Sequence, residues 1–571
     1  MMKTGVLFAL VCGSGGLCAG APAAGSPSME GDTLVGDGAT MNTATFNAAI
    51  DKLSKAGGGV LFLKPGRYLT GTIYLKSGVT LHLENGAEIL GSTNIADYPE
   101  NPPPSPSTTL EFGRYSLIYA AGQHDIAITG EGKISGQGSS PNFTKKILIE
   151  RGYSDADALY KRPFGLCLVG CRHVQVRNVT LEDIAFWTED YLDCDDVVVD
   201  GVSVNNSKED FNNDGIDVDG SRNVRISNCN FYAGDDGICL KSSYSMCEHV
   251  TITNCIVRSL CNGIKFGTAS RCGFKNIAIS NCVIHATGVA GMALEVVDGG
   301  VLDGVTVANL AMEDVGTPVF IRLGNRGKRF LNNQSPASVG TLRNVTITGI
   351  TSTVSRRDGT FACPISGLPG HPIENLRISN VRIFLQEGSG NVHLDDFQSH
   401  YLREATRIIE QTFGGQIKNV TVRDVPENPA DYPEYPMFGP LPAYGFFCRH
   451  VNNIAFEGLD LRFEKAESRS AFAFYDVHGL NLDGFHAESS PGSNAVLLLR
   501  DVADALFRGA VAREGTPVFL RVEGNSDDIH LYDSDLSRAA SAVSLETGLE
   551  SRRITLGTDV VMPASRPAIQ K

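Results

Sequence analysis

Six aspartates lie in two short stretches near the middle of the chain, and their spacing points to acid–base chemistry. The first stretch reads DFNNDGIDVDG (210–220) and the second reads GDDGICLKS (234–242). Carboxylates held close together repel one another, so one can keep its proton near neutral pH while its neighbour stays ionised. Glycoside hydrolysis uses such a division: an acid protonates the leaving oxygen, and a carboxylate activates water or attacks the sugar. The six are Asp210, Asp214, Asp217, Asp219, Asp235 and Asp236.

The same residues allow two simpler hypotheses. Clustered aspartates can bind calcium, but the first stretch lacks the Glu that the twelfth position of an EF-hand loop requires. Acidic turns are also commonly solvated and have no further role. Whether the carboxylates meet depends on how the strands and turns that carry the aspartates are arranged.

A repeat of about 25 residues places the two stretches on neighbouring turns of the chain. Three segments of one pattern, RNVRISNCNF, EHVTITNCIV and KNIAISNCVI, start at residues 222, 248 and 275. A second pattern runs in step with them, with starts at residues 214, 236, 262, 290 and 317. Each segment alternates apolar and polar residues, which is typical of a short strand, and turn residues separate the segments. Short strands on such a repeat predict an all-β fold, a parallel β-helix built as one solenoid.

Within this frame the apolar residues of DGIDVDG point inward and its acids point outward. Asp214 lies at the turn before the strand, and Asp235 and Asp236 occupy the corresponding turn one coil later. The three carboxylates are therefore expected to lie a few ångströms apart on the outer face. Charged residues at matching positions of adjacent coils predict two ion pairs, Asp219 with Lys241 and Glu295 with Arg322.

The composition limits the class of partner and the location. The 571 residues carry a net charge of −15, which disfavours nucleic acid or an anionic membrane as the main partner. The first residues, MMKTGVLFALVCGSGGLCAGAPAAG, predict a signal peptide over 1–24, so we expect a secreted or periplasmic protein. No apolar run is long enough for membrane insertion. One β-helix domain over 25–565 is expected to follow, as a monomer, with a capping helix over 43–57.

The cysteines are expected to be core thiols rather than metal ligands. Cys229, Cys255 and Cys282 occupy the position that Val179 and Leu310 take in other coils, which predicts a ladder of small buried residues. No C-x-x-C pair occurs, so neither a zinc site nor another metal or cofactor is predicted. Disulfides remain an alternative at cysteines nearer the turns, namely Cys167, Cys171, Cys247, Cys261 and Cys272.

The acidic motifs resemble those of glycoside hydrolase family 28, the polygalacturonase family of right-handed parallel β-helices. Residues 212–214, Asn-Asn-Asp, resemble the family's Asn-Thr-Asp motif, and residues 234–236 match its Gly-Asp-Asp motif one coil later. The stretches GGGVLFLKPGRYLTGTIYLKSGVTLHLENGAEILGS (57–92) and FWTEDYLDCDDVVVDGVSV (186–204) resemble other parts of the family pattern. The resemblance extends to about residue 350 and implies catalytic coils at about 160–330.

This resemblance implies roles for the three aspartates. Family members invert the anomeric centre, so Asp235 would be the general acid, and Asp214 and Asp236 would activate the attacking water. The carboxyl groups of an inverting pair are expected to lie ~6.5–9.5 Å apart, which leaves room for that water.

Two departures from the family pattern predict an altered sugar-recognition subsite. The family's Gly-His-Gly motif corresponds to residues 261–263, Cys-Asn-Gly, and its Arg-Ile-Lys motif corresponds to residues 291–295, GMALE. Glu295 therefore stands where the family has a lysine, and it would repel a uronate carboxylate. The candidates for substrate binding are Asn262, Lys265, Asn212, Asp217, Arg322 and Trp187, with Arg326, Lys328 and Arg329 as a further basic cluster.

The leading hypothesis is an exported, inverting hydrolase that acts on a pectic polysaccharide of galacturonan or rhamnogalacturonan type. A β-helix polysaccharide lyase is one alternative, and it would need calcium and a proton abstractor such as Lys241 or Lys265. A non-catalytic glycan-binding solenoid is the other. A segment rich in proline and aromatic residues (424–445) either covers the flank of the solenoid or supplies rings that stack on sugars.

Overall fold

The computed structural model of the chain describes residues 28–30, 33–104, 113–139, 141–206, 212–354, 362–386, 424–439, 441–465, 467–563 and 569–570. The expected signal peptide, residues 1–24, and Asp210 lie outside these ranges. No helix in the described ranges has the length and apolar character needed to cross a membrane.

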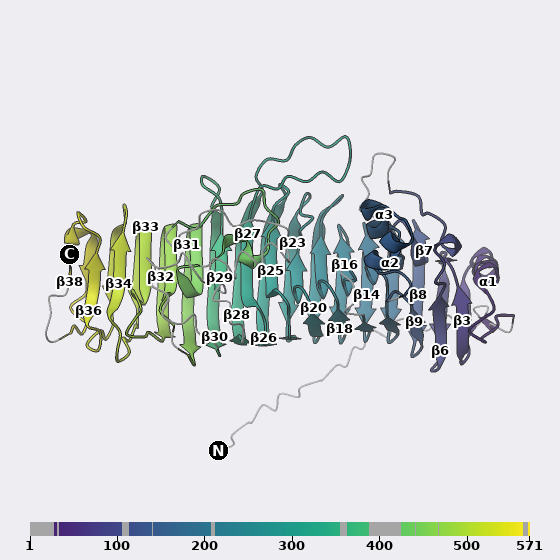
Figure 1. The fold of residues 1–571 in the computed structure, drawn as a ribbon, viewed down its shortest axis with the longest axis horizontal. Coiled ribbons are helices and arrows are strands. Elements are labelled where there is room, and N and C mark those ends of the chain that lie inside the picture. Colours follow the sequence, from purple (N-terminus) through teal and green to yellow (C-terminus); the bar gives the residue numbers. More distant parts are fainter. Residues whose placement is uncertain are drawn as a thin grey trace, which may run out of the picture.

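Short strands wind round one long solenoid, the right-handed parallel β-helix expected from the sequence (Figure 1). Each strand pairs in parallel with its counterpart one coil before and one coil after. The strands fall into three stacks, and long strands in the C-terminal half join the stacks into one continuous sheet. The predicted fold class is confirmed.

The first stack, here called the site stack, includes the strands that begin directly after the acidic turns. It comprises β4 (Ile73–Tyr74), β7 (Ser116–Ala121), β10 (Phe164–Val169), β13 (Glu189–Leu192), β16 (Ile216–Asp219), β19 (Ile238–Lys241), β22 (Ile264–Phe266), β25 (Ala290–Val296), β27 (Thr317–Leu323), β29 (Cys363–Ser366), β34 (Val518–Glu523), β36 (Ser541–Leu545) and β38 (Ile569–Gln570). The second stack comprises β1 (Ser28–Glu30), β2 (Gly59–Leu63), β5 (Val79–Leu83), β8 (His124–Gly130), β11 (Arg172–Arg177), β14 (Asp195–Asp200), β17 (Arg222–Ser227), β20 (Cys247–Thr253), β23 (Phe274–Ser280), β35 (Asp527–Tyr532) and β37 (Ile554–Leu556). The third comprises β3 (Gly66–Thr70), β6 (Ala87–Gly91), β9 (Lys133–Ser135), β12 (Thr180–Glu182), β15 (Ser203–Asn205), β18 (Asn230–Ala233), β21 (Ile256–Ser259) and β24 (Val283–His285). The long joining strands are β26 (Val301–Glu313), β28 (Thr341–Val354), β30 (Ile373–Leu385), β31 (Ala443–Phe463), β32 (Ser470–Ala487) and β33 (Leu497–Arg508).

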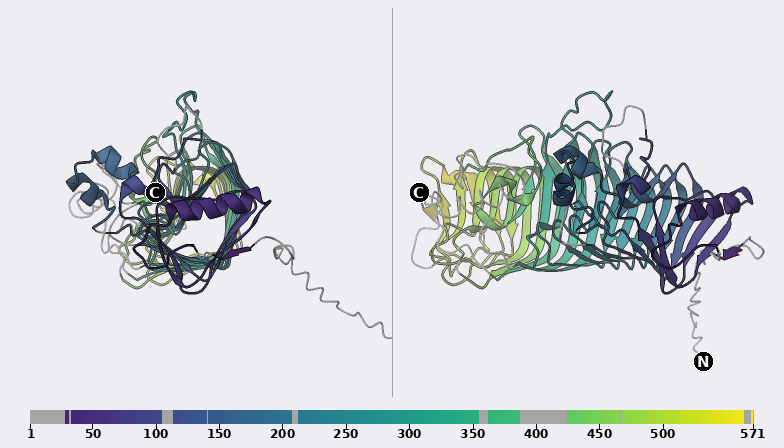
Figure 2. Two further views of the ribbon diagram at one scale, coloured as in Figure 1. Left: turned by 90° about the vertical axis from the view of Figure 1, so that its right-hand side faces the viewer. Right: turned by 45° about the vertical axis from the view of Figure 1, so that its right-hand side comes forward.

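A helix, α1 (Thr43–Lys55), closes the N-terminal end of the solenoid (Figure 2). Its buried residues, which include Phe46, Ile50 and Leu53, lie on one face. The capping helix is therefore confirmed, and it ends just before Gly57, whose φ of 93° leaves the helical region. The sequence pattern does not predict the helices of six residues between β9 and β10, because they are too short to show a period: α2 (Lys145–Glu150) and α3 (Asp155–Tyr160). Single 3₁₀ turns complete the inventory: η1 (Ile95–Asp97), η2 (Tyr435–Phe438) and η3 (Ser551–Arg553).

The repeated Asn-Cys pair marks one corner of the central coils. Asn228, Asn254 and Asn281 have left-handed φ values of 58°, 54° and 55°, a conformation that asparagine tolerates better than most residues. The cysteine after each asparagine is buried, as the predicted ladder requires: Cys229, Cys255 and Cys282. The twelve cysteines in the described part of the chain are all free, so the alternative disulfides do not form there.

Glycine follows the acidic turns because neighbouring coils approach there through their backbones. A Cβ atom on Gly215 would lie 2.3 Å from the carbonyl oxygen of Gly237 on the next coil. The Gly215 N–H donates to the Asp236 carbonyl at 2.9 Å, and the Gly237 N–H donates to the Asn262 carbonyl at 2.8 Å. These contacts stack Asp214, Asp236 and Asn262 as one column of turn residues, one per coil.

Candidate active site

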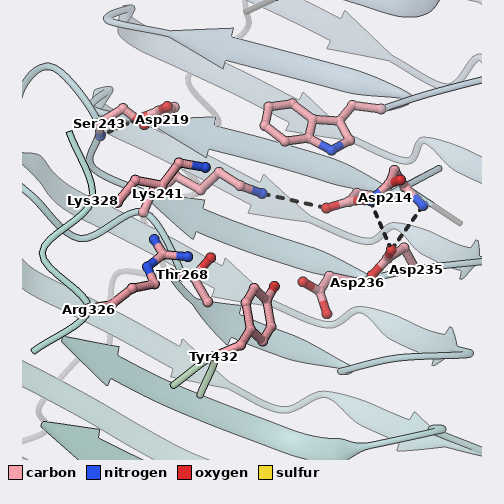
Figure 3. A pocket seen from close by; sticks show the side chains of 14 residues that line it. Asp214, Asp219, Asp235, Asp236, Lys241, Ser243, Thr268, Arg326, Lys328 and Tyr432 are labelled. Carbon is pink, nitrogen blue, oxygen red and sulfur yellow. Dashed lines mark hydrogen bonds and ion pairs between the residues drawn. The ribbon is translucent and has the colours of Figure 1, made fainter. Parts of the chain in front are cut away.

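The acidic turns border one pocket on the outer face of the site stack (Figure 3). The pocket has a volume of about 220 Å³, and Asp214, Asp235 and Asp236 all line it. The one-coil spacing in the sequence therefore brings the three candidate carboxylates together. The other lining residues are Trp187, Asn212, Asp219, Lys241, Ser243, Gly267, Thr268, Ala269, Arg326, Lys328 and Tyr432.

The turn before β16 holds the carboxylate of Asp235. The backbone N–H of Asn212 donates to Asp235 Oδ2 at 2.9 Å, and the Asn212 side-chain nitrogen lies 3.5 Å from the same oxygen. Asn212 has a left-handed φ of 64°, and its side-chain oxygen accepts a hydrogen bond from the buried Arg162 at 3.0 Å. Asn212, a predicted substrate-binding residue, borders the pocket, and it also orients the candidate acid.

Asp236 is held from behind, on the side away from the pocket. Its Oδ1 accepts hydrogen bonds from the Asn262 backbone at 3.1 Å and the Asn262 side chain at 2.8 Å, and its Oδ2 lies 3.3 Å from Lys265 Nζ. Asn262 is fully buried, Lys265 is 1 % exposed, and neither lines the pocket. The prediction that both bind substrate is therefore corrected: they fix a carboxylate. The sequence places them on the outward face but does not reveal that another segment covers them.

Lys241 connects the remaining acids. Its ammonium contacts Asp217, lies 3.5 Å from Asp214 Oδ2 and lies 4.2 Å from the centre of the Trp187 ring. The register places Lys241 beside Asp219 as predicted, but its ammonium reaches the acids nearer the turn (Figure 3). Asp217 is fully buried and neutralises Lys241, so its predicted contact with substrate is corrected. Trp187 does border the pocket.

Burial and neighbouring charges shift the pKa values of the two adjacent acids in opposite directions. Burial, together with the charge of Asp236, raises the pKa of Asp235. Burial also opposes ionisation of Asp236, but Lys265 and Lys241 outweigh it and hold the pKa of Asp236 below its usual value. Asp235 is thus suited to donate a proton while Asp236 is suited to accept one.

Asp214 lies close enough to Asp236 for both to hold one water. A carboxylate oxygen of Asp214 lies within 4.8 Å of a carboxylate oxygen of Asp236. The same upper limit holds for the distance between a carboxylate oxygen of Asp235 and one of Asp236. Two hydrogen bonds of ordinary length from one water span roughly such a gap. These nearest oxygens are closer than the ~6.5–9.5 Å expected for an inverting pair, because the acids sit on adjacent residues and stacked turns. Burial and the charge of Asp217 raise the pKa of Asp214 well above its usual value, which favours Asp236 as the base.

Cations face the acidic turns across the pocket. Arg326 and Lys328 lie in the loop after β27, and both line the pocket; we call them the basic wall. Arg326 donates to the two oxygens of the buried Asp298 at 3.0 and 2.5 Å, and the Lys328 backbone N–H donates to the same carboxylate at 2.8 Å. Two members of the predicted basic cluster therefore face the site, while Arg329 is exposed and does not line it.

Residues 424–439, here called the covering segment, lie across the outer face of the site stack. Arg322 is fully buried and donates to two of its carbonyl oxygens at 2.7 and 3.2 Å. Arg449 does the same at 2.7 and 2.6 Å, and both arginines donate to Ser366 Oγ at 2.9 Å. The Phe438 ring lies 5.2 and 5.0 Å from the two guanidinium carbons. The predicted role of Arg322 in substrate binding is corrected: it fastens the covering segment.

The ion pair predicted between Glu295 and Arg322 does not form. The two residues face each other in register, but Arg322 turns to the covering segment. Both carboxyl oxygens of Glu295 are buried and have no hydrogen-bond partner among the described residues. Burial raises the pKa of Glu295 well above its usual value, which favours the neutral form.

The covering segment combines the two alternatives considered for its aromatic residues. Tyr435 and Phe438 are buried and pack on the solenoid, whereas Tyr432 lines the pocket beside Arg326. The segment also carries Glu434, whose carboxylate contacts Lys265 at 2.7 Å and Asn262 at 3.1 Å. The sequence pattern does not indicate Glu434 as a site residue, because 169 residues separate it from Lys265.

Two groups of side chains have spacing that a metal ion could use: Asp214 with Asp236 and Cys239, and Asp235 with Asp236 and Cys261. Lysine ammonium groups already contact the carboxylates in both groups, through Asp214 and Asp236. A divalent cation would lie beside these positive charges, which opposes its binding. The donor set therefore does not favour a resident metal.

Comparison with known proteins identifies relatives over much of the chain. The model of "Glycosyl hydrolases family 28" matches residues 76–401, more than half of the sequence. A "Probable polygalacturonase" of Vitis vinifera is 27% identical over 355 residues, which cover 59% of this chain and 70% of that protein. An "Endo-polygalacturonase" of Pectobacterium carotovorum subsp. carotovorum is 25% identical over 268 residues, which cover 44% of this chain and 64% of that protein.

Solved structures agree on the fold. An exopolygalacturonase from Thermotoga maritima matches with a TM-score of 0.53 and 22% identity, over 64% of this chain and 91% of that one. A family 28 exopolygalacturonase from Yersinia enterocolitica matches with a TM-score of 0.51 and 19% identity, over 83% of this chain and 78% of that one. With the family match across the acidic turns, these similarities establish that the chain is a glycoside hydrolase and belongs to glycosyl hydrolases family 28.

Proposed function

We propose that this hydrolase is exported and cleaves a uronate-containing pectic polysaccharide with inversion at the anomeric carbon. The observation that carries the proposal is the pocket itself. Asp235, with a raised pKa, and Asp236, with a lowered one, border it on one side, and the basic wall borders it on the other. The polygalacturonases among its relatives support pectin as the substrate class.

The two adjacent acids divide the reaction. Asp235 donates its proton to the glycosidic oxygen as the bond to the anomeric carbon breaks. Asp236 accepts a proton from the water that attacks this carbon from the opposite face, and Asp214 helps to hold that water. Asp235 ends ionised and Asp236 ends protonated, so one proton must return from Asp236 to Asp235 through solvent before the next cycle.

The substrate class follows from the charges that border the pocket. Arg326 and Lys328 can bind a carboxylate on the sugar, and Tyr432 offers an aromatic ring beside them. Glu295 does not line the pocket, so it presents no repelling charge to a uronate. In the altered subsite, the basic wall therefore supplies the positive charge that the lost family motif would have provided at another position.

The alternatives to hydrolysis receive less support. A lyase base must lose its proton before it can act. Burial opposes the charge on Lys241 and Lys265, but neighbouring carboxylates raise the pKa of both well above the usual value. Neither lysine is therefore available as a proton abstractor. Family membership also argues against a solenoid that only binds glycan.

The test is incubation of the full chain with homogalacturonan, rhamnogalacturonan I, rhamnogalacturonan II and a neutral galactan. We expect reducing ends from a uronate-containing polymer, with no new ultraviolet absorbance from a carbon–carbon double bond. Absorbing products would support the lyase, and release from the neutral polymer alone would contradict the uronate subsite. The Asp235→Asn variant serves as the inactive control.

The proposal extends to export and oligomeric state. The charged start and short apolar run of residues 1–24 support cleavage and export. Mass spectrometry of the mature protein should show a new N-terminus near residue 25, and light scattering should give the mass of a monomer. A retained N-terminus would contradict cleavage and export, and a larger mass would contradict the monomer.

A further inference from the structure

The covering segment delivers one carboxylate to the back of the active site. Glu434 is 1 % exposed and precedes the 3₁₀ turn η2. The clamp of Arg322 and Arg449 holds the backbone of its segment, and the Asn428 side chain donates to the Met437 carbonyl at 2.8 Å across it. Glu434 is thus fixed in place by contacts that do not involve the pocket.

Glu434 completes the hydrogen bonds of Asn262. The Asn262 side-chain nitrogen has two hydrogens, and it donates to Asp236 Oδ1 at 2.8 Å and to Glu434 Oε1 at 3.1 Å. The Asn262 side-chain oxygen accepts from the Ala290 N–H at 3.0 Å. Every polar atom of the amide is therefore used, which favours one orientation of the side chain. Without Glu434 one donor would keep only the sulfur of Cys261, a weak acceptor at 3.3 Å.

Glu434 also shares the ammonium of Lys265 with Asp236. Lys265 Nζ lies 2.7 Å from Glu434 Oε1 and 3.3 Å from Asp236 Oδ2. Burial raises the pKa of Glu434 to about 7, whereas the pKa of Asp236 lies below its usual value. Glu434 is therefore neutral at the low pH where Asp236 takes up a proton, and it acts on Asp236 there through the geometry of Lys265 and Asn262.

We propose that Glu434 is a positioning residue for the reaction: through Asn262 and Lys265 it orients the Asp236 carboxylate. The inference rests on the proposed function, in which Asp236 is the base. Glu434 lies outside residues 76–401, so this chain draws the positioning group from a part that the family model does not match. The titratable and charged groups that face Glu434 are Asp236, Lys265, Glu295, Tyr432 and Cys261.

Two variants test the orientation. Glu434→Gln keeps an acceptor for Asn262 and Lys265, so kcat at its plateau should stay within about threefold of the parent. The acidic limb of the kcat/KM profile should not move, because Glu434 carries no charge in that pH range. Glu434→Ala removes the acceptor, and kcat should fall about tenfold or more with KM little changed, because Glu434 does not line the pocket.

Asp431→Asn is the matched control, since Asp431 is an exposed carboxylate of the same segment. It should leave the pH profile and kcat unchanged. A loss of kcat in Glu434→Gln equal to that in Glu434→Ala, or the parent kcat in Glu434→Ala, would overturn the inference.

A crystal structure of Glu434→Ala decides the orientation without turnover. We expect Asn262 Nδ2 to leave Asp236 Oδ1, and an unchanged 2.8 Å contact would refute the inference. If the parent releases no sugar from any pectin, the proposed function fails while this structure still tests Glu434. If the parent is active and the variants match it, Glu434 has no positioning role and the proposed function stands.

Discussion

Asp235 and Asp236 are neighbours in the chain, yet their surroundings move their pKa values in opposite directions. Burial and the charge of Asp236 raise the pKa of Asp235, whose Oδ2 accepts one backbone hydrogen bond at 2.9 Å. Asp236 is the more buried of the two, but a lysine at 3.3 Å and two hydrogen bonds from Asn262 stabilise its charge. One turn of the solenoid therefore presents an acid and a base side by side.

The first prediction concerns the acid. Asp235→Asn cannot donate the proton that the leaving oxygen needs, so kcat should fall by about 10²–10⁴-fold. The melting temperature should change little, because an amide of the same shape can still accept the Asn212 hydrogen bond. Reducing-end assays and thermal unfolding check both parts. Activity within a few fold of the parent would remove Asp235 from the role of acid.

The second prediction concerns stereochemistry. If Asp236 activates a water rather than attacking the sugar, the first product should carry the opposite anomeric configuration to the substrate linkage. Proton NMR of the fresh product, recorded before mutarotation, distinguishes the anomers. A retained configuration would indicate a covalent intermediate and would favour a nucleophilic aspartate, consistent with the short distance between the acids.

The third prediction concerns the basic wall. Lys328→Met removes one cation that lines the pocket, so KM for a uronate oligosaccharide should rise about threefold while kcat changes little. The same oligosaccharide with methyl-esterified carboxyl groups serves as the control, and its KM should not change. An equal rise for both substrates would mean that Lys328 does not contact the uronate charge.

The fourth prediction concerns stability rather than catalysis. Glu189 points into the core of the solenoid, where Tyr191 donates to it at 2.5 Å, and burial raises its pKa from 4.5 to about 7. The folded chain thus binds this proton more tightly than the unfolded chain, so stability falls as pH rises from about 4.5 through 7. The loss attributable to Glu189 is about 3 kcal/mol.

Glu189→Gln removes this titration, because the amide stays neutral at every pH. Chemical unfolding at pH 5 and pH 8 should show a smaller loss of unfolding free energy for the variant than for the parent. Glu313→Gln, at an exposed glutamate, should behave like the parent. Parallel losses in Glu189→Gln and the parent would show that Glu189 does not bind the proton in question.

The local pattern of the chain predicts a large part of this molecule. Alternation with period 2 places Ile216 and Val218 in the core, and the one-coil spacing brings Asp214 to Asp236. The cysteine ladder and the capping helix follow from the same repeat, because each depends on residues within one or two coils. Register between neighbouring coils is fixed by burial of one strand face, so contacts of this range can be derived from sequence.

The partners of long outward-facing side chains, in contrast, cannot be derived from the repeat. Lys265, Asn262 and Arg322 stand on the outward face as the sequence indicates, but the tertiary structure decides whether that face meets solvent, substrate or another segment. The covering segment reaches it from about 100 to 170 residues along the chain and turns these residues from ligands of a sugar into supports of the site. Periodic burial along the chain thus specifies the solenoid and its row of aspartates. The direction in which each pKa moves follows instead from contacts in the folded chain, with a lysine, an amide and a distant glutamate that no repeat relates.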